Sequence, residues 1–126
     1  MQSFKTLQTQ EADEDNSFGW LVGYMVATRQ HIESVFGQPT YDKLSDDTKV
    51  TTEWVIRFDD GTIARIYDYK RYEQGAPKLD EVYEWHIGSS TNTAVPLVGS
   101  AILKDISDFD PNNPPTFRSV KFAAMS

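Results

Sequence analysis

The stretch VTTEWVIRFDDGTIARIYDY, from Val50 to Tyr69, decides the fold. Apolar residues alternate with polar ones on both sides of Asp59-Asp60-Gly61, which is typical of two antiparallel strands joined by a tight turn. A two-residue turn would set Glu53 opposite Asp68, a destabilising pair of like charges. A three-residue turn with Gly61 in a left-handed conformation avoids that pair. We therefore expect the three-residue turn.

In this register the hairpin has one apolar and one mixed face, because successive side chains of a strand point to opposite sides. The face expected to enter the core carries Trp54, Ile56, Phe58, Ala64 and Ile66. The opposite face carries Glu53, Val55, Arg57, Ile63, Arg65, Tyr67 and Tyr69.

Upstream of the hairpin, one strand and one helix are predicted. The segment Trp20 to Ala27 is short and apolar on both faces, which favours a buried strand. A helix is expected over Arg29 to Phe36, capped by Thr28 and ended by Gly37. Residues 40–49 are polar and are predicted to form a loop.

Downstream of the hairpin, a further strand and helix follow a loop over residues 70–80. The strand over Glu81 to Ile87 directs Tyr83, Trp85 and Ile87 inward, and Val82, Glu84 and His86 outward. Gly88-Ser89-Ser90 is expected to break it. The helix starts near Asn92 or Thr93, with Pro96 in its first turn and Val95, Val98 and Ile102 on one side.

These elements predict an α+β domain over residues 1–126, a small antiparallel sheet with two helices packed on it. The chain order is strand, helix, three strands, helix. Residues 1–16 are polar and acidic, and are expected to be a loose arm rather than a pairing strand. Residues 105–126 are expected to form a linker and tail, in which Thr116 to Phe122 can form a last strand.

The composition excludes several functional classes. Nineteen acidic against 12 basic residues give a net charge of −7, which disfavours binding to polymeric nucleic acid. The chain has no cysteine and no apolar run long enough to cross a membrane, and its polar, acidic first residues are not expected to form a signal peptide. We therefore expect a soluble cytoplasmic protein without disulfides.

No motif for catalysis or metal binding is present. His31 and His86 have no partners at ligand spacing, and Asp105, Asp108 and Asp110 lack the glycine and glutamate of a calcium loop. Neither a nucleophile elbow nor a phosphate-binding glycine motif occurs. No cofactor, metal or catalytic residue is predicted, although His86 beside Glu84 leaves hydrolysis as an alternative.

Two groups of residues could bind a phosphorylated, base-containing small molecule. Arg57, Arg65, Tyr67 and Tyr69 share the mixed sheet face, where guanidinium groups can bind phosphate and rings can stack on bases. The turn after the last strand exposes backbone amides at a helix start. The alternative is structural: the tyrosines pack across strands, and the arginines pair with Glu53 and Glu84.

Several motifs of this sequence together resemble those of one protein family. FGQP (Phe36 to Pro39), KVTTEWVIRFDDGTIARIYDYK (Lys49 to Lys70) and EWHIGS (Glu84 to Ser89) are similar to the motifs of small phage proteins, the first anti-Thoeris sponge family. The resemblance covers about residues 20–104. Ser89 stands where the family tends to have a second glycine, and Arg65 replaces a small or neutral residue.

The resemblance implies a non-enzymatic homo-oligomer, a dimer or larger, in the cytoplasm of an infected bacterium. Such a protein sequesters a cyclic ADP-ribose isomer and so blocks immunity based on TIR-domain proteins; some members also hold cyclic oligonucleotides at a second site. A protein-binding inhibitor with an acidic surface and a small hydrolase of a signalling nucleotide are the alternatives. The sequence does not specify the isomer or the stoichiometry.

We expect the primary ligand at the strand-to-helix turn and the tail. The residues expected there are Trp85, His86, Gly88, Ser89, Asn92, Phe117 and Arg118. Asn92 offers donors and acceptors for a base or ribose, and Arg118 offers the positive charge. A second candidate nucleotide site consists of Arg57, Arg65, Tyr67 and Tyr69. We expect the ligand at this second site if it does not bind at the turn.

Overall fold

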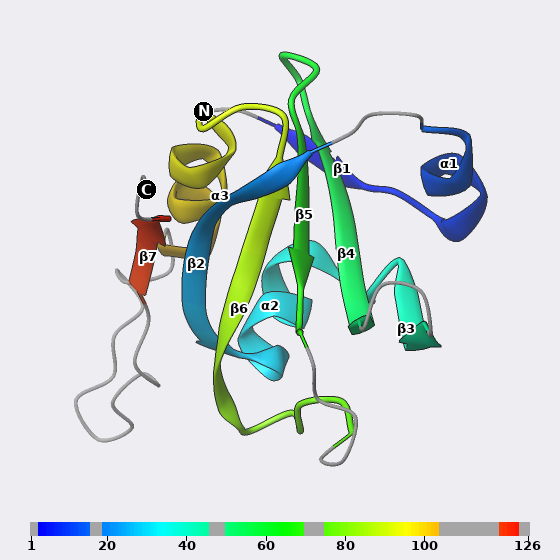
Figure 1. Ribbon diagram of the computed structural model, residues 1–126, viewed down its shortest axis with the longest axis vertical. Helices are drawn as coiled ribbons and strands as arrows, with labels where there is room; N and C mark the ends of the chain where they lie inside the picture. Colours follow the sequence, from blue (N-terminus) through cyan, green and yellow to red (C-terminus); the bar gives the residue numbers. More distant parts are fainter. Residues whose placement is uncertain (1–2, 16–18, 46–49, 70–74, 104–118, 124–126) are drawn as a thin grey trace.

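A seven-stranded antiparallel sheet and three helices make up the described residues of the computed structural model, which are 3–15, 19–45, 50–69, 75–103 and 119–123 (Figure 1). The strands are β1 (Phe4–Thr6), β2 (Trp20–Thr28), β3 (Tyr41–Ser45), β4 (Val50–Phe58), β5 (Ile63–Tyr67), β6 (Val82–Ser89) and β7 (Ser119–Phe122). The helices are α1 (Thr9–Glu14), α2 (Arg29–Phe36) and α3 (Ala94–Leu103). The sheet order is β1-β4-β5-β6-β2-β7, and β3 also pairs with β4. The predicted α+β class is confirmed.

The β4–β5 hairpin has the predicted three-residue turn. Phe58 N donates to Thr62 O at 2.9 Å, and Arg57 pairs with Ile63. Gly61 has a φ of 90°, the left-handed region that the turn requires. Asp60 Oδ1 accepts from Thr62 N at 2.9 Å and closes the turn.

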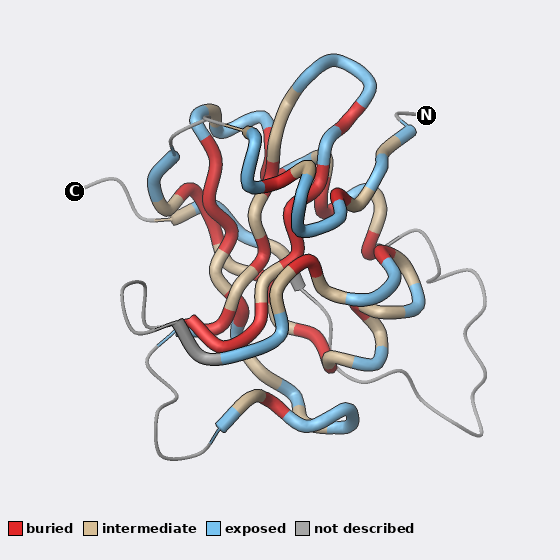
Figure 2. The backbone as a smooth tube through the Cα atoms, turned by 90° about the vertical axis from the view of Figure 1, so that its right-hand side faces the viewer, coloured by how far each residue is buried: buried red, intermediate tan, exposed pale blue. Residues whose placement is uncertain are grey.

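Helices α2 and α3 cover one face of the sheet and bury its apolar side chains. The core contains Val22, Met25, Ala27, Ile32, Phe36, Trp54, Ile56, Phe58, Ala64, Ile66, Trp85, Ile87, Ala94, Val95, Val98 and Ile102. Figure 2 shows these buried segments in the interior, with exposed residues at the turns. Thr28 caps α2 as predicted, accepting from His31 N at 3.1 Å. His31 Nε2 donates to Ile102 O at 2.9 Å and ties α2 to α3.

The expectation of a loose N-terminal arm is wrong for residues 3–15. Strand β1 pairs with β4, opposite Phe58 to Ile56, and α1 follows it. Leu7 is only 1% exposed and packs with Ala12 and Val55 in a small cluster on the sheet face opposite α2 and α3. The arm is ordered because it covers Val55, an apolar residue on the mixed face.

Two loop predictions also need correction. Within the segment predicted as a polar loop, residues 41–45 form β3, because Tyr41 pairs with Glu53 of β4 and packs against the Leu7 cluster. Gly88 and Ser89 do not break the preceding strand but extend β6, since they pair with Leu21 and Trp20 of β2. Ser89 Oγ also donates to Ile63 O at 2.7 Å.

Strand β7 forms one edge of the sheet by pairing with β2. Its residues lie within the predicted strand Thr116 to Phe122, whose first three residues are outside the described part of the chain. The close approach of β7 requires Gly23, because a Cβ there would lie 2.6 Å from Lys121 O and 2.8 Å from a methyl of Val95. None of the helices in the described ranges combines the length and the apolar character needed to cross a bilayer.

Gly61→Val should destabilise the protein by about 1–2 kcal/mol, because a β-branched residue is strained at positive φ. The space around Gly61 is open, so no clash adds to this cost. Gly61→Asn is the control and should cost less, since asparagine tolerates this region better. Urea denaturation measures both. A valine variant as stable as the parent would contradict the turn geometry.

Leu7→Ala should cost about 2–5 kcal/mol, the range for truncating a buried leucine. Gln10→Ala, at an exposed position of α1, should change stability by less than about 0.5 kcal/mol. Thermal unfolding of the two variants distinguishes a packed N-terminal segment from a loose arm, for which both substitutions would be neutral.

Candidate functional site

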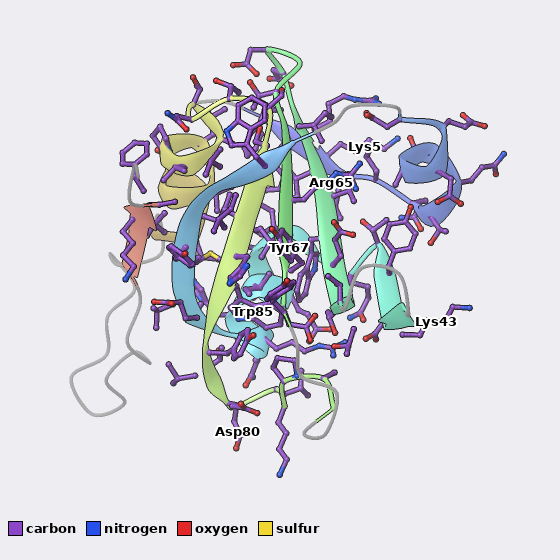
Figure 3. All side chains as sticks on the ribbon, viewed as in Figure 1. Lys5, Lys43, Arg65, Tyr67, Asp80 and Trp85 are labelled. Carbon is purple, nitrogen blue, oxygen red and sulfur yellow. The ribbon has the colours of Figure 1, made fainter. Side chains whose placement is uncertain are left out.

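Aromatic side chains cover the middle of the outer face, the side of the sheet opposite α2 and α3. Tyr67 pairs with His86, and His86 pairs with Tyr24, so these three side chains from β5, β6 and β2 lie side by side. Tyr69 follows two residues after β5 ends. We call Tyr24, Tyr67, Tyr69 and His86 the aromatic cluster. Arg65 and Tyr67 follow one another along β5 on this face (Figure 3).

The imidazole of His86 lies at the centre of the aromatic cluster. Its centroid is 5.3 Å from the stacked ring of Tyr69, and 5.4 Å and 5.3 Å from the edge-on rings of Tyr67 and Tyr24. Tyr69 is held there by Tyr83, whose hydroxyl accepts from Tyr69 N at 3.2 Å. Burial lowers the pKa of His86, so the ring is neutral at neutral pH.

A cavity of about 270 Å³ adjoins the aromatic cluster. The described residues that line it are Gly19, Trp20, Val50, Glu53, Arg65, Tyr67, Tyr69 and Gly88. Trp20 is 60% exposed and Tyr69 is 39% exposed, so two rings at the cavity present area to solvent. Gly88 allows Tyr67 to lie against β6, since a Cβ there would come within 3.2 Å of the Tyr67 ring. The result is an open hollow with aromatic walls.

One ion pair supplies the charge in this cavity. Arg65 Nη1 lies 3.5 Å from Glu53 Oε2, and both side chains are mostly buried. Burial raises the pKa of Glu53, and the positive charge of Arg65 opposes that rise. Burial also raises the pKa of Tyr67. At neutral pH the described lining therefore carries one negative and one positive charge, which compensate each other.

The residues predicted to bind the primary ligand lie in different parts of the structure. Gly88 adjoins the cavity and His86 lies in the aromatic cluster. Trp85, next in sequence to His86, points to the core instead, where its Nε1 donates to Ala27 O at 3.2 Å. Ser89 is buried with its hydroxyl on Ile63 O, and Asn92 is exposed before α3. Phe117 and Arg118 lie outside the described residues.

The second predicted site is brought together except for Arg57. Arg65, Tyr67 and Tyr69 all line the cavity. Arg57 instead lies beside α1, with Nη2 3.9 Å from Asp15 Oδ2. Its surroundings form another hollow, of about 470 Å³, lined by Glu11, Glu14 and Asp15 as well as Arg57. Three carboxylates against one guanidinium make that hollow unsuited to phosphate.

The structural alternative for the arginines holds in part. The structural alternative predicted that the arginines pair with Glu53 and Glu84. Arg65 does pair with Glu53, whereas Glu84 pairs with Lys121 at 3.3 Å. Two residues were not predicted from the sequence: Trp20, which lines the cavity, and Tyr24, which belongs to the aromatic cluster. Their sequence signal was weak, because both sit in an apolar run whose two faces cannot be distinguished by alternation.

Among the described residues no group of three histidine, aspartate or glutamate side chains could hold a metal ion. Comparisons with protein-family models, curated proteins and solved structures found no match to this chain.

Arg65→Gln should raise the pKa of Glu53 further, because removing a positive charge at 3.5 Å leaves burial unopposed. A carbon-13 titration of the Glu53 carboxyl group measures the change. Arg57→Gln is the matched control, since Arg57 pairs with Asp15, and should leave the Glu53 titration unaltered. An unchanged pKa in Arg65→Gln would mean that the ion pair is absent in solution.

Proposed function

We propose that the chain is a non-enzymatic protein that binds and sequesters a signalling nucleotide of the cyclic ADP-ribose type, and so acts as a phage anti-defence protein. The observation that carries this proposal is the aromatic cavity on the outer face, which is lined by Trp20, Tyr67 and Tyr69 together with the Glu53–Arg65 pair. Aromatic rings stack on bases at about 1–3 kcal/mol each. The resemblance to anti-Thoeris sponges supplies the ligand class.

Binding without turnover is favoured by the state of the two groups that could act as bases. Glu53 Oε2 lies 3.5 Å from Arg65 Nη1, so this oxygen faces the guanidinium rather than a bound ligand. His86 is neutral but packed among three tyrosine rings. General base catalysis requires a group within hydrogen-bond reach of its proton. These surroundings support storage of a ligand rather than its hydrolysis.

A second copy of the chain is part of the proposal. The cavity of about 270 Å³ lies below the range of about 300–1,000 Å³ that small-molecule sites usually occupy. A dinucleotide-sized ligand would therefore extend beyond it and remain open to solvent on one chain. A protomer placed over Trp20 and Tyr69 would cover the ligand and those two rings. The oligomer would thus complete the site.

A retention experiment tests the function. The protein is mixed with cyclic ADP-ribose isomers, desalted and denatured, and the released ligand is chromatographed. We expect intact nucleotide to be released. An altered product would instead indicate a hydrolase, and the absence of any retained nucleotide would favour a protein-binding inhibitor.

Two variants locate the ligand in the same experiment. Tyr67→Leu should weaken retention about 5- to 150-fold, the effect of losing one stacked ring. Asn92→Asp should leave the helix start intact, because Asn92 is exposed and lies two residues before α3, and it places a negative charge at the turn. Asn92→Asp should retain ligand like the parent. The reverse pattern would place the ligand at the turn before α3.

Sedimentation velocity tests the oligomer. At micromolar concentration we expect a dimer or larger species, because the exposed rings at the cavity would be covered by a second protomer. Trp20→Ser should shift the protein toward monomer, whereas Leu79→Ser, at an exposed apolar residue away from the cavity lining, should not. A parent protein that sediments only as a monomer would contradict the shared site.

A further inference from the structure

We infer that the outer-face cavity holds the nucleoside end of the ligand, its base and ribose, while the phosphates lie outside. Glu53 is the specificity-determining residue that accepts hydrogen bonds from ribose hydroxyls. This inference rests on the proposed function and specifies which part of the nucleotide enters the cavity.

The charge of the cavity disfavours phosphate. Arg65 is the cation of the described lining, and it lies 3.5 Å from Glu53. A phosphate that approached Arg65 would come close to the Glu53 carboxylate in partly buried surroundings, where repulsion is poorly screened. A nucleoside carries no charge and meets no such repulsion.

The walls of the cavity suit a flat base. Trp20, Tyr67 and Tyr69 provide three rings, and Trp20 presents most of its surface to solvent. Stacking needs only the face of an aromatic ring and tolerates every base. The volume of about 270 Å³ matches a site for part of a nucleotide better than one for the whole.

The carboxylate of Glu53 suits the ribose. An ionised carboxylate is an acceptor only, and its two oxygens can take hydrogen bonds from two neighbouring hydroxyls. Oε2 faces Arg65, and the side chain lines the cavity while remaining partly exposed. The same pairing of an acidic side chain with a ribose hydroxyl occurs in dinucleotide-binding folds. Phosphate at neutral pH offers few donors to such an acceptor.

Trp20 gives this cavity its own fluorescent reporter. The chain has three tryptophans, and Trp54 and Trp85 are both fully buried in the core. Quenching by a probe bound in the cavity would therefore come from Trp20. Trp20→Phe should abolish the quenching, with binding then followed by calorimetry.

The experiment titrates the full chain with adenosine, 2′-deoxyadenosine and inorganic pyrophosphate. We expect saturable quenching by adenosine, weaker binding of 2′-deoxyadenosine, and no binding of pyrophosphate. Glu53→Gln should weaken adenosine binding about tenfold or more, the effect of losing a hydrogen bond to a charged group. It should also allow pyrophosphate to bind, because Arg65 is then unpaired.

Glu84→Gln is the matched control. Glu84 lies on β6, faces the same side of the sheet as His86, and pairs with Lys121 rather than with a cavity residue. Its substitution removes the same charge from the same face and should change neither adenosine nor pyrophosphate binding. Circular dichroism of both variants confirms that they are folded.

Three results would overturn the inference. They are a parent protein that fails to bind adenosine, a parent protein that binds pyrophosphate, and a Glu53→Gln variant that binds adenosine with the same affinity as the parent. Each is separable from failure of the proposed function. A protein that retains cyclic nucleotide but ignores adenosine sequesters its ligand elsewhere. One that binds adenosine through Glu53 but retains no cyclic nucleotide has the nucleoside site without the proposed function.

Discussion

The pairing register of β4 with β5 is the constraint on which both the core and the candidate site depend. Because side chains alternate along a strand, a shift of one residue would exchange the two faces of that strand. In the observed register Trp54 pairs with Ile66 on the core side, while Glu53 pairs with Tyr67 and Val55 with Arg65 on the outer side. The turn at Gly61 therefore sets which rings enter the core and which line the cavity.

Buried polar contacts hold the end of this hairpin in place. Asp68 is fully buried, and its carboxylate accepts from Thr51 N at 2.8 Å, from Thr52 N at 3.0 Å and from the Thr51 hydroxyl. These bonds attach the residue between Tyr67 and Tyr69 to the start of β4. Charge-assisted hydrogen bonds of this kind are stronger than neutral ones. They place both tyrosines on a rigid support, which favours precise stacking.

Most of the central fold was predictable from the sequence, because the hairpin and β6 alternate, α2 carries capping signals, and β2 is a short apolar run. The arm and β3 were not, since they contain few apolar residues and are stabilised by long-range contacts. Leu7 and Tyr41 pack with Val55, and Phe4 packs against the main core. Val55, an apolar residue on the mixed face, was the sequence signal that another segment covers this part of the sheet.

The candidate site was predictable only in part, for a related reason. Arg65, Tyr67 and Tyr69 share a face by simple alternation, and the sequence grouped them correctly. The structure separates Trp85 from His86, which were predicted to bind the same ligand, because they are adjacent in sequence and their side chains point to opposite sides of β6. Trp20 joins the cavity through pairing of β2 with the end of β6, a long-range contact without a local sequence signal.

The charge balance connects the cavity to the whole chain. A protein with a net charge of −7 repels polyanions, and a phosphate-based site would have to overcome that field. A cavity whose own charges cancel and whose walls are aromatic avoids the difficulty, because stacking depends weakly on the overall field. Recognition of this kind does not rely on counterion release, which makes phosphate-based binding strongly dependent on salt. Affinity for a nucleoside end should therefore persist as salt rises, whereas any contribution from the phosphates should decline.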